Sequence, residues 1–189
     1  MNDSAFVDRV NAISDAFGKS VEFDNKIAED KLQYSSWLLA IATAGFGLAV
    51  TQFKPILDAN LLLPMLSESA SRWLLLSAAL AFLASAISGA LVKLFGNKEI
   101  ESCRQRLTVI LLQKVWVESG ENRPPSGSDI SDLIQSVTAC ELLPQDKQKK
   151  YDEFKKNGES ASKIYERALV VQQSVAGIGY LLLFAVALL

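Results

Sequence analysis

Two adjacent glutamines, Gln172 and Gln173, are the side chains whose type and setting most strongly indicate a function. They interrupt an otherwise apolar stretch at the C-terminal end of the chain. Lipid cannot satisfy the donors and acceptors of a carboxamide, so such a group normally faces protein or a water-filled path. Two interpretations follow for this pair: a hydrogen bond to another helix or to interfacial water, and a place in the lining of a pore.

The patterns required for catalysis or metal binding do not occur. The chain has no histidine, which removes the usual general base and the commonest metal ligand. Cys103 and Cys140 form no CxxC pair, and we expect both to be buried free thiols in a reducing compartment. No phosphate-binding glycine loop or nucleophile elbow is present. We therefore expect no catalytic residue, no metal site, no cofactor and no enzymatic activity.

Small side chains recur at helical spacing in two further apolar stretches, and they predict faces for helix–helix contact. These residues are Ser77, Ala81, Ser85 and Gly89 in one stretch, and Ala40, Ala44 and Gly47, with Ser36, Thr43 and Thr51, in the other. Lipid provides no hydrophobic drive for helix association, so close backbone approach and interhelical hydrogen bonds must supply it. The two faces could join helices within one chain or join copies in an oligomer, and both interpretations stay open.

Three stretches are long and apolar enough to cross a bilayer: residues 34–53, 73–95 and 168–189. About 20 helical residues cover the roughly 30 Å of a hydrocarbon core. Trp37 and Phe53 lie near the ends of the first stretch, as in an aromatic belt, and Lys93 can snorkel from the second. A soluble chain of 189 residues could not surround three such helices, so the sequence predicts an integral membrane protein.

Composition agrees with this division. Half the residues are hydrophobic, yet 21% are charged, and all of the charged residues except Lys93, near the end of the second stretch, lie outside the three stretches. The net charge of −2 argues against a nucleic-acid-binding protein, which would carry a basic face. We therefore expect the lipid bilayer as a partner and no direct contact with nucleic acid.

Basic residues near the span ends predict the orientation. Four precede the first span, two lie in the link between the first and second spans, and twelve follow the second span: Arg9, Lys19, Lys26 and Lys31; Lys54 and Arg72; Lys98, Arg104, Arg106, Lys114, Arg123, Lys147, Lys149, Lys150, Lys155, Lys156, Lys163 and Arg167. The N-terminus and the section after the second span should be cytosolic. The link and the C-terminus should lie outside.

The cytosolic parts are expected to be helical. One apolar stripe near the N-terminus alternates spacings of four and three, and we expect Gly18 to end its helix and a second helix to begin near Asp24: the stripe is Phe6, Val10, Ile13 and Phe17. So narrow a stripe needs a partner surface. That surface could be the membrane, the cytosolic section or another subunit, and the acidic polar face favours protein over anionic lipid.

The section between the second and third spans should contain several helices. The second span is expected to continue inward as far as Lys114, and residues 121–129 should form a loop. Ser128 or Asp129 could cap the next helix, whose apolar face is Ile130, Leu133, Ile134 and Val137. After Pro144 a lysine-rich helix should run from Gln145 to Gly158, and a last helix should start near Glu159 and enter the third span.

The predicted fold is therefore all-α: an integral membrane helical bundle with three transmembrane helices and a cytosolic helical section. Its expected parts are N-terminal helices at 1–33, a transmembrane hairpin at 34–95, a cytosolic section at 96–167 and a third span at 168–189. We expect a homo-oligomer, and a cytosolic protein partner that contacts the N-terminal helix and residues 96–167.

The order of these elements over residues 20 to 118 resembles the small membrane effectors of prokaryotic defence systems, in particular SLATT-type two-span modules and the membrane effectors of some retrons. The third span departs from the two-span pattern. The resemblance implies an oligomeric effector of the bacterial inner membrane that disrupts or permeabilises the bilayer in antiphage defence. The alternative is a non-catalytic membrane anchor or scaffold that holds a cytosolic complex at the bilayer.

Overall fold

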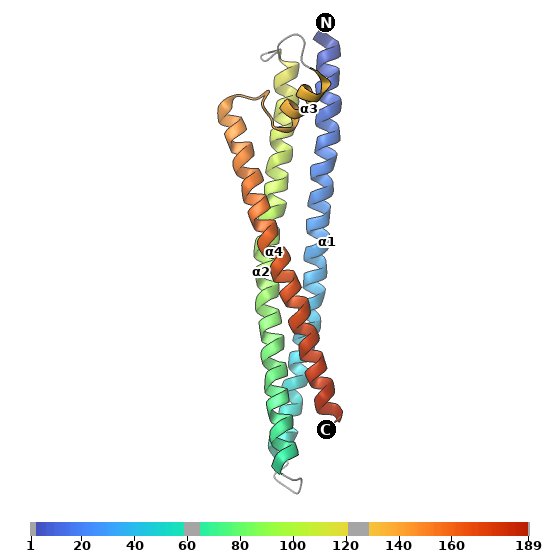
Figure 1. The fold of residues 1–189 in the computed structure, drawn as a ribbon, viewed down its shortest axis with the longest axis vertical. Helices are drawn as coiled ribbons and strands as arrows, with labels where there is room; N and C mark the ends of the chain where they lie inside the picture. The colour runs from blue at the N-terminus through green and yellow to red at the C-terminus, as the bar shows by residue number, and fades with distance from the viewer. Residues whose placement is uncertain (1–2, 59–64, 121–128, 189) are drawn as a thin grey trace. The chain divides into compact units, whose positions relative to one another are not determined.

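The computed structural model describes residues 3–58, 65–120 and 129–188. Within these ranges the chain forms four helices and no strand: α1 (Asp3–Asp58), α2 (Met65–Glu118), α3 (Ile130–Thr138) and α4 (Gln145–Leu188) (Figure 1). The predicted all-α class is confirmed. The expected link between the first two spans, with Lys54, Pro55 and Pro64, and most of the loop at 121–129 fall on residues whose side chains or backbone lie outside the described part of the chain.

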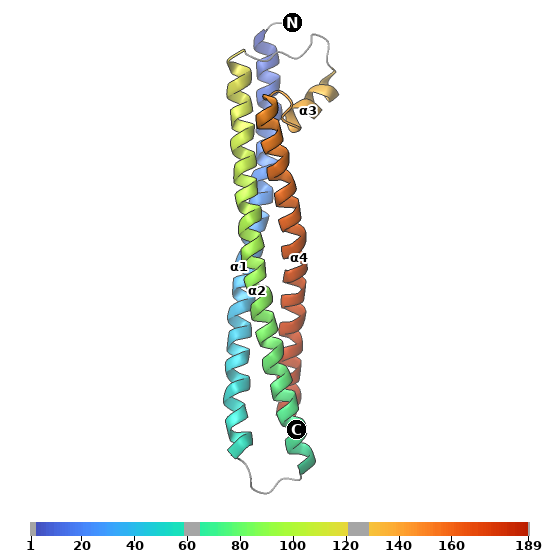
Figure 2. The same cartoon turned by 90° about the vertical axis from the view of Figure 1, so that its left-hand side faces the viewer.

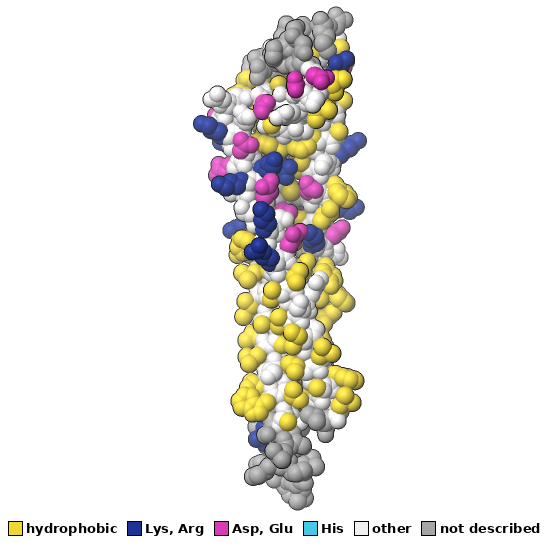
Figure 3. Space-filling model, viewed as in Figure 1, with side chains coloured by type: hydrophobic (Ala, Val, Ile, Leu, Met, Phe, Trp, Pro, Cys, Tyr) yellow, Lys and Arg dark blue, Asp and Glu magenta, His cyan; other side chains and the backbone are white. Residues whose placement is uncertain are grey.

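The chain divides into two compact units, and α1, α2 and α4 each contribute to both. We call them the charged unit, which comprises Met1–Asp30 and Gly96–Ser162, and the membrane unit, which comprises Lys31–Phe95 and Lys163–Leu189. The unit borders follow residues 30, 95 and 162, whereas the expected membrane borders follow residues 33, 95 and 167. On the face shown in Figure 3, apolar side chains dominate the membrane unit, and most of the charged ones lie on the charged unit.

The membrane unit consists of three helical segments that lie side by side in both views (Figures 1 and 2). α1, α2 and α4 are each long and apolar enough to cross a membrane, and they contain the stretches predicted as spans. Large aliphatic and aromatic side chains point outward from all three, among them Leu48, Leu83, Ile87 and Phe184. A surface of this kind is stable in lipid and not in water, so the protein is membrane-associated.

Buried positions in the membrane unit alternate spacings of three and four, which is the pattern of helices packed at a shallow angle. They are Ser35, Leu38, Ala42, Gly45 and Ala49 on α1, and Leu75, Ala78, Phe82, Ser85, Gly89 and Val92 on α2. Most of these side chains are small, so the backbones can approach closely.

A first apolar core of the charged unit contains the stripe predicted near the N-terminus. Val10 is fully buried with Val117, Leu133, Val137 and Leu142, and Phe6 and Ile13 pack against the same group. The surface that stabilises the stripe is therefore the section after the second span of the same chain. That resolves the three alternatives left by the sequence.

The short helix α3 docks on this core through two side chains and one hydrogen bond. Asp129, one of the two predicted candidates, caps it, and its Oδ1 accepts from the Ile130 N–H at 2.7 Å. Leu133 and Val137 are buried, and the Gln113 Nε2 donates to the Val137 carbonyl at 3.0 Å. The other half of the predicted apolar face, Ile130 and Ile134, is exposed.

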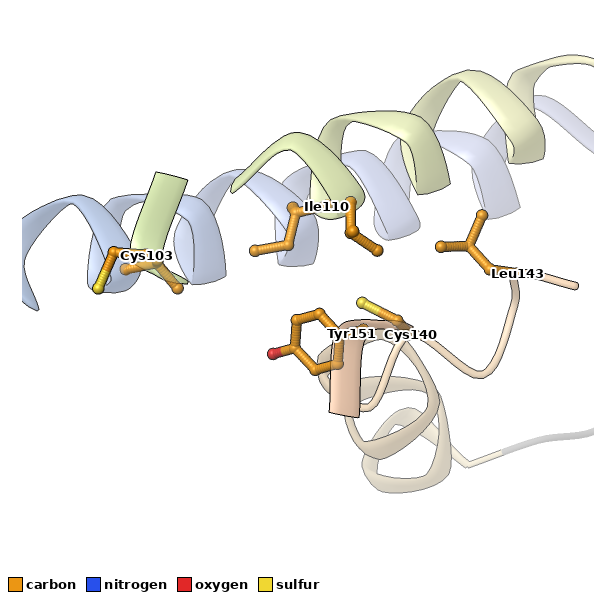
Figure 4. Close-up of a cluster of buried hydrophobic side chains, with 7 residues drawn as sticks. Cys103, Ile110, Cys140, Leu143 and Tyr151 are labelled. Carbon is orange, nitrogen blue, oxygen red and sulfur yellow. The ribbon is translucent and has the colours of Figure 1, made fainter. Parts of the chain in front are cut away.

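A second core of the charged unit joins α1, α2, the turn after α3 and α4 (Figure 4). Cys103, Cys140 and Tyr151 are buried in it, and both cysteines are free thiols, as expected. Cys140 adopts a left-handed conformation with φ of 55°, directly after the helix cap at Ala139. Burial raises the pKa of the Cys103 and Cys140 thiols and of the Tyr151 phenol, and the pKa of Cys140 reaches about 12.

These buried acids predict that the charged unit loses stability at alkaline pH. The pKa of Cys140 is near 9 in the unfolded chain and about 12 in the folded one. At pH values between these two, the thiol is protonated in the folded chain and deprotonated in the unfolded chain. The free energy of unfolding must then fall as pH rises, by at most about 1.4 kcal/mol per pH unit for this group. Thermal unfolding in detergent at pH 8 to 11 should show this slope, and Cys140→Ala should make it shallower. Equal slopes for both proteins would refute the assignment.

Two predicted helix boundaries are wrong. α1 runs through Gly18 and Asp24 without a break, and α4 runs through Gly158 and Glu159. A glycine inside a helix costs about 1 kcal/mol relative to alanine, and the buried apolar faces on both sides of each glycine offset that cost. Gly158 has a packing role, because a Cβ there would lie 3.1 Å from the Ser102 Cβ and closer still to its hydroxyl.

Candidate functional site

The membrane unit contains a buried polar node centred on Gln172 of α4. The Ser35 Oγ of α1 donates to Gln172 Oε1 at 2.7 Å, and Gln172 Nε2 donates back to the Ser35 carbonyl at 3.0 Å. The Ser85 Oγ of α2 donates to the backbone carbonyl of Gln172 at 3.1 Å. Gln172 is 0% exposed. The node therefore joins all three spans through Gln172. Both the oxygen and the nitrogen of its side-chain amide have a hydrogen-bond partner.

Gly89 of α2 makes room for this amide. A Cβ at position 89 would lie 2.7 Å from Gln172 Nε2 and 3.3 Å from its Cδ, so no larger residue fits without displacing the side chain. Interhelical hydrogen bonds in membrane proteins contribute about 0.6 kcal/mol each on average, up to about 1.7 kcal/mol. Three such bonds at one level make the node a strong determinant of helix register.

An aromatic layer further along the spans fills the rest of the interior. The Phe82 ring of α2 lies between Gly45 of α1 and Gly179 of α4, where an added Cβ would approach its Cε1 to 2.5 Å and 2.8 Å, respectively. Tyr180 meets Phe82 edge-on at 5.0 Å between ring centroids, and its hydroxyl donates to the Ile41 carbonyl at 2.7 Å. Phe82, Ala42 and Ala78 form a closed apolar cluster.

A charged pair lies at the border of the membrane unit, just before the first span. Lys31 Nζ donates to Glu166 Oε1 at 2.9 Å and lies 5.3 Å from the centroid of the Tyr165 ring. Burial alone would lower the pKa of Lys31, but its hydrogen bonds to Glu166 and Tyr165 outweigh that effect and raise the pKa. Lys31 therefore stays protonated, and its bond to Glu166 ties α1 to α4.

The remaining predicted residues lie away from the node. Gln173 is exposed, although its neighbour Gln172 is buried, because successive helical residues differ by about 100° in direction. Among the predicted interface residues of α2, Ser85 and Gly89 are buried within the chain, Ala81 is half-buried and Ser77 is exposed. A strip at every fourth position turns by about 40° per step, so only one end of it enters the interface.

On α1 the predicted strip lies on the outer surface. Ala40, Ala44 and Gly47 are all exposed, and a Cβ on Gly47 would meet no atom within 4 Å. The face that packs within the chain is the other small-residue face, with Ser35, Ala42 and Gly45. Packing within one chain therefore does not account for the predicted strip on α1.

Four hydroxyl groups on the outer surfaces of α1 and α4 are satisfied by their own helices. Ser36, Thr43, Thr51 and Ser174 each donate to a carbonyl three or four residues earlier, at 2.8 to 3.0 Å. Such bonds let a serine or threonine face lipid without an unpaired donor.

Sequence reasoning missed several residues that build the interior, namely Ser35, Gly45, Phe82, Gly179 and Tyr180. Gly45 and Gly179 occur in apolar stretches that hold other glycines, such as Gly47 and Gly177, which meet nothing. The one available signal was Phe82 on α2, which continues the alternating three- and four-residue spacing of Leu75, Ala78 and Ser85. Its partners lie on other helices and could not be read from it.

This arrangement can fix three helices to one another. The interior levels are filled in turn by the Gln172 node and by Phe82 with its glycines. Gln172 therefore takes part in hydrogen bonds between helices, which fits the first of the two interpretations, and a place for the pair in a pore lining stays a prediction. Over the described ranges, no three or more thiol or carboxylate ligands gather where they could hold a metal ion.

Fold and site together define a helical membrane protein of three candidate spans, locked by an interhelical polar node. Comparisons of the chain with protein families, curated proteins and solved structures found no match.

Proposed function

We propose that the protein is a non-catalytic, oligomeric effector of the bacterial inner membrane that permeabilises the bilayer, as in antiphage defence. Its N-terminus and charged unit lie in the cytosol, and its C-terminus lies outside. A cytosolic protein partner binds the charged unit and restrains the effector until it is released. The resemblance in element order and the basic residues near the span ends support this proposal.

The observation that carries the proposal is the closed interior of the single chain. Gln172 and Phe82 fill it, and no Asp, Glu, Lys or Arg lies inside residues 34–51, 73–92 or 168–188. A path for ions therefore has to form between copies rather than through one. Gln173 is the strongly polar side chain that the third span directs outward, where a second copy can reach it.

Exposed apolar residues on the charged unit support control by a protein partner. Leu111, Leu112 and Val115 project from α2, Phe23 projects from α1, and Ile130 and Ile134 project from α3. These residues lie outside the spans, among charged neighbours. Apolar side chains exposed together on a polar surface commonly mark protein-binding sites.

The same residues favour a second candidate, a membrane anchor or scaffold. In that case the charged unit would hold a cytosolic complex at the bilayer, and the spans would do nothing beyond anchoring it. The two functions differ in what happens when the chain is present in the membrane without its partner.

Membrane potential separates them. We expect full-length protein, expressed in a bacterial host that lacks the partner, to depolarise the cells, as measured with a potential-sensitive dye. Gln173→Leu at the same membrane abundance should depolarise less, because it removes the outward amide. Val171→Leu, an exposed change on the same helix, serves as the matched control and should behave as the unmodified chain.

An intact potential in cells whose membranes contain the full-length protein would contradict the effector function and leave the anchor. Dye release from liposomes with increasing protein-to-lipid ratio gives the same answer without host factors. Release that rises more steeply than in proportion to protein is expected of a path between copies.

A further inference from the structure

The amide of Gln173 is the one outward polar group of the third span without a hydrogen bond in the described structure. Ser174, next to it, donates to the Val170 carbonyl at 2.9 Å, whereas Gln173 has no bonded partner. A primary amide has two donors and one acceptor oxygen, and hydrocarbon satisfies none of them. Gly177, one helical turn further on, is also exposed, and a Cβ there would meet no atom within 4 Å.

α4 is also the span least covered by the rest of the chain. Of the most apolar stretch of each helix, 17% is buried in α4, compared with 28% in α1 and 39% in α2. The outer face of α1 has small residues too, but its hydroxyls at Ser36, Thr43 and Thr51 already donate to their own helix. α4 therefore combines the least covered surface with an unpaired amide, whereas these hydroxyls on the small-residue face of α1 are already bonded.

The geometry of insertion determines which partner this face meets. Copies of one chain insert with the same topology, so the same residue lies at the same depth in each. At the depth of Gln173, a second Gln173 offers both a donor and an acceptor to the first. Across a two-fold axis the two amides can exchange hydrogen bonds, as an isologous contact requires.

We infer that α4 is the contact between two copies of this chain, with the helices parallel, Gln173 bonded to Gln173 of the other copy, and the Gly177 backbones in close approach. The residue pair Gln173 and Gly177 has the spacing of one helical turn, so both lie on one face. A glycine at that point lets the helices approach closely enough for the amides to meet.

This contact is the interface of the oligomer in the proposed function, and the inference rests on that function. Its test, however, measures cross-linking and not permeability. Gly177→Cys in otherwise unchanged full-length protein should form a disulfide-linked dimer in isolated membranes under mild oxidation. The native Cys103 and Cys140 are buried and stay in place. Ala40→Cys, exposed on α1, is the matched control and should remain a monomer on the gel.

A second variant does not depend on a new cysteine. Gln173→Leu should raise the dimer dissociation constant in mild detergent about ten-fold, which corresponds to about 1.4 kcal/mol for the paired amide bonds. Val171→Leu should leave it unchanged. Sedimentation or mass photometry of the detergent complexes measures both.

Cross-linking at Ala40→Cys but not at Gly177→Cys would overturn the α4 contact in favour of α1. A monomer at every concentration, together with no cross-link at Gly177→Cys, would show that Gln173 is solvated at the membrane surface instead. Dimers without depolarisation would contradict the proposed function and leave this contact standing. Depolarisation with no α4 cross-link would contradict this contact alone.

Discussion

Gly45→Leu should strongly destabilise the membrane unit, whereas Gly47→Leu, two residues away on α1, should leave its stability nearly unchanged. A side chain at position 45 would enter the space of the Phe82 ring, and the ring has little room to move because Gly179 of α4 also lies close to it. Overpacking in a filled core costs about 1–3 kcal/mol or more. We expect the upper end of that range here, since the ring is also packed against Ala42, Ala78 and Tyr180.

Gly47 provides a close control, because it has the same residue type, the same helix and nearly the same depth, and a Cβ there meets no atom. Unfolding in detergent, followed by circular dichroism against increasing denaturing detergent, measures the difference. The double variant Gly45→Leu with Phe82→Ala should recover part of the loss. Equal stability of the two single leucine variants would contradict the packing of Phe82 between the glycines.

Gln172→Ala should destabilise the membrane unit by about 2–4 kcal/mol, which is the second large effect. The change removes both amide hydrogen bonds with Ser35 and leaves a cavity opposite Gly89. The lost bonds contribute about 0.6–1.7 kcal/mol each, and a cavity from a large-to-small substitution adds a comparable amount.

Val171→Ala is the matched control for this change, since Val171 precedes Gln172 directly and is exposed. It should change stability by less than about 0.5 kcal/mol, as outer-surface substitutions usually do. The denaturing-detergent midpoint of each variant tests this. A Gln172→Ala midpoint equal to that of Val171→Ala would show that the node does not hold the spans together.

The spans were predictable from the sequence because their signal is local. An uninterrupted run of about 20 apolar residues requires a bilayer wherever its neighbours lie. The N-terminal stripe of Phe6, Val10, Ile13 and Phe17 and the Asp129 cap were predictable for the same reason, since periodicity and capping depend on nearby residues. The structure confirms both.

The packed faces were not predictable, because α1 carries small residues on two sides. Ala40, Ala44 and Gly47 form as good a strip as Ser35, Ala42 and Gly45, and only the positions of α2 and α4 decide which one is covered. The helix breaks expected at Gly18 and Gly158 failed for a related reason. Packing against distant residues, such as Ser102 opposite Gly158, outweighs the local cost of a glycine.

Gln172 and Gln173 show the same limit at the site itself. Both are glutamines in the same apolar stretch, so the sequence could not indicate which amide is buried and hydrogen-bonded and which one faces outward. The difference is about 100° of helical rotation, and it is fixed by Ser35, Ser85 and Gly89 on the other spans.

The outer hydroxyls that bond to their own helix have a consequence for biogenesis. With the donors of Ser36, Thr43 and Ser174 engaged, these residues present mainly methylene and methyl groups to the surroundings. The membrane-insertion machinery, which meets each segment as a helix, would therefore meet a more apolar surface than the amino-acid composition suggests. Alanine at those three places should consequently alter insertion efficiency very little.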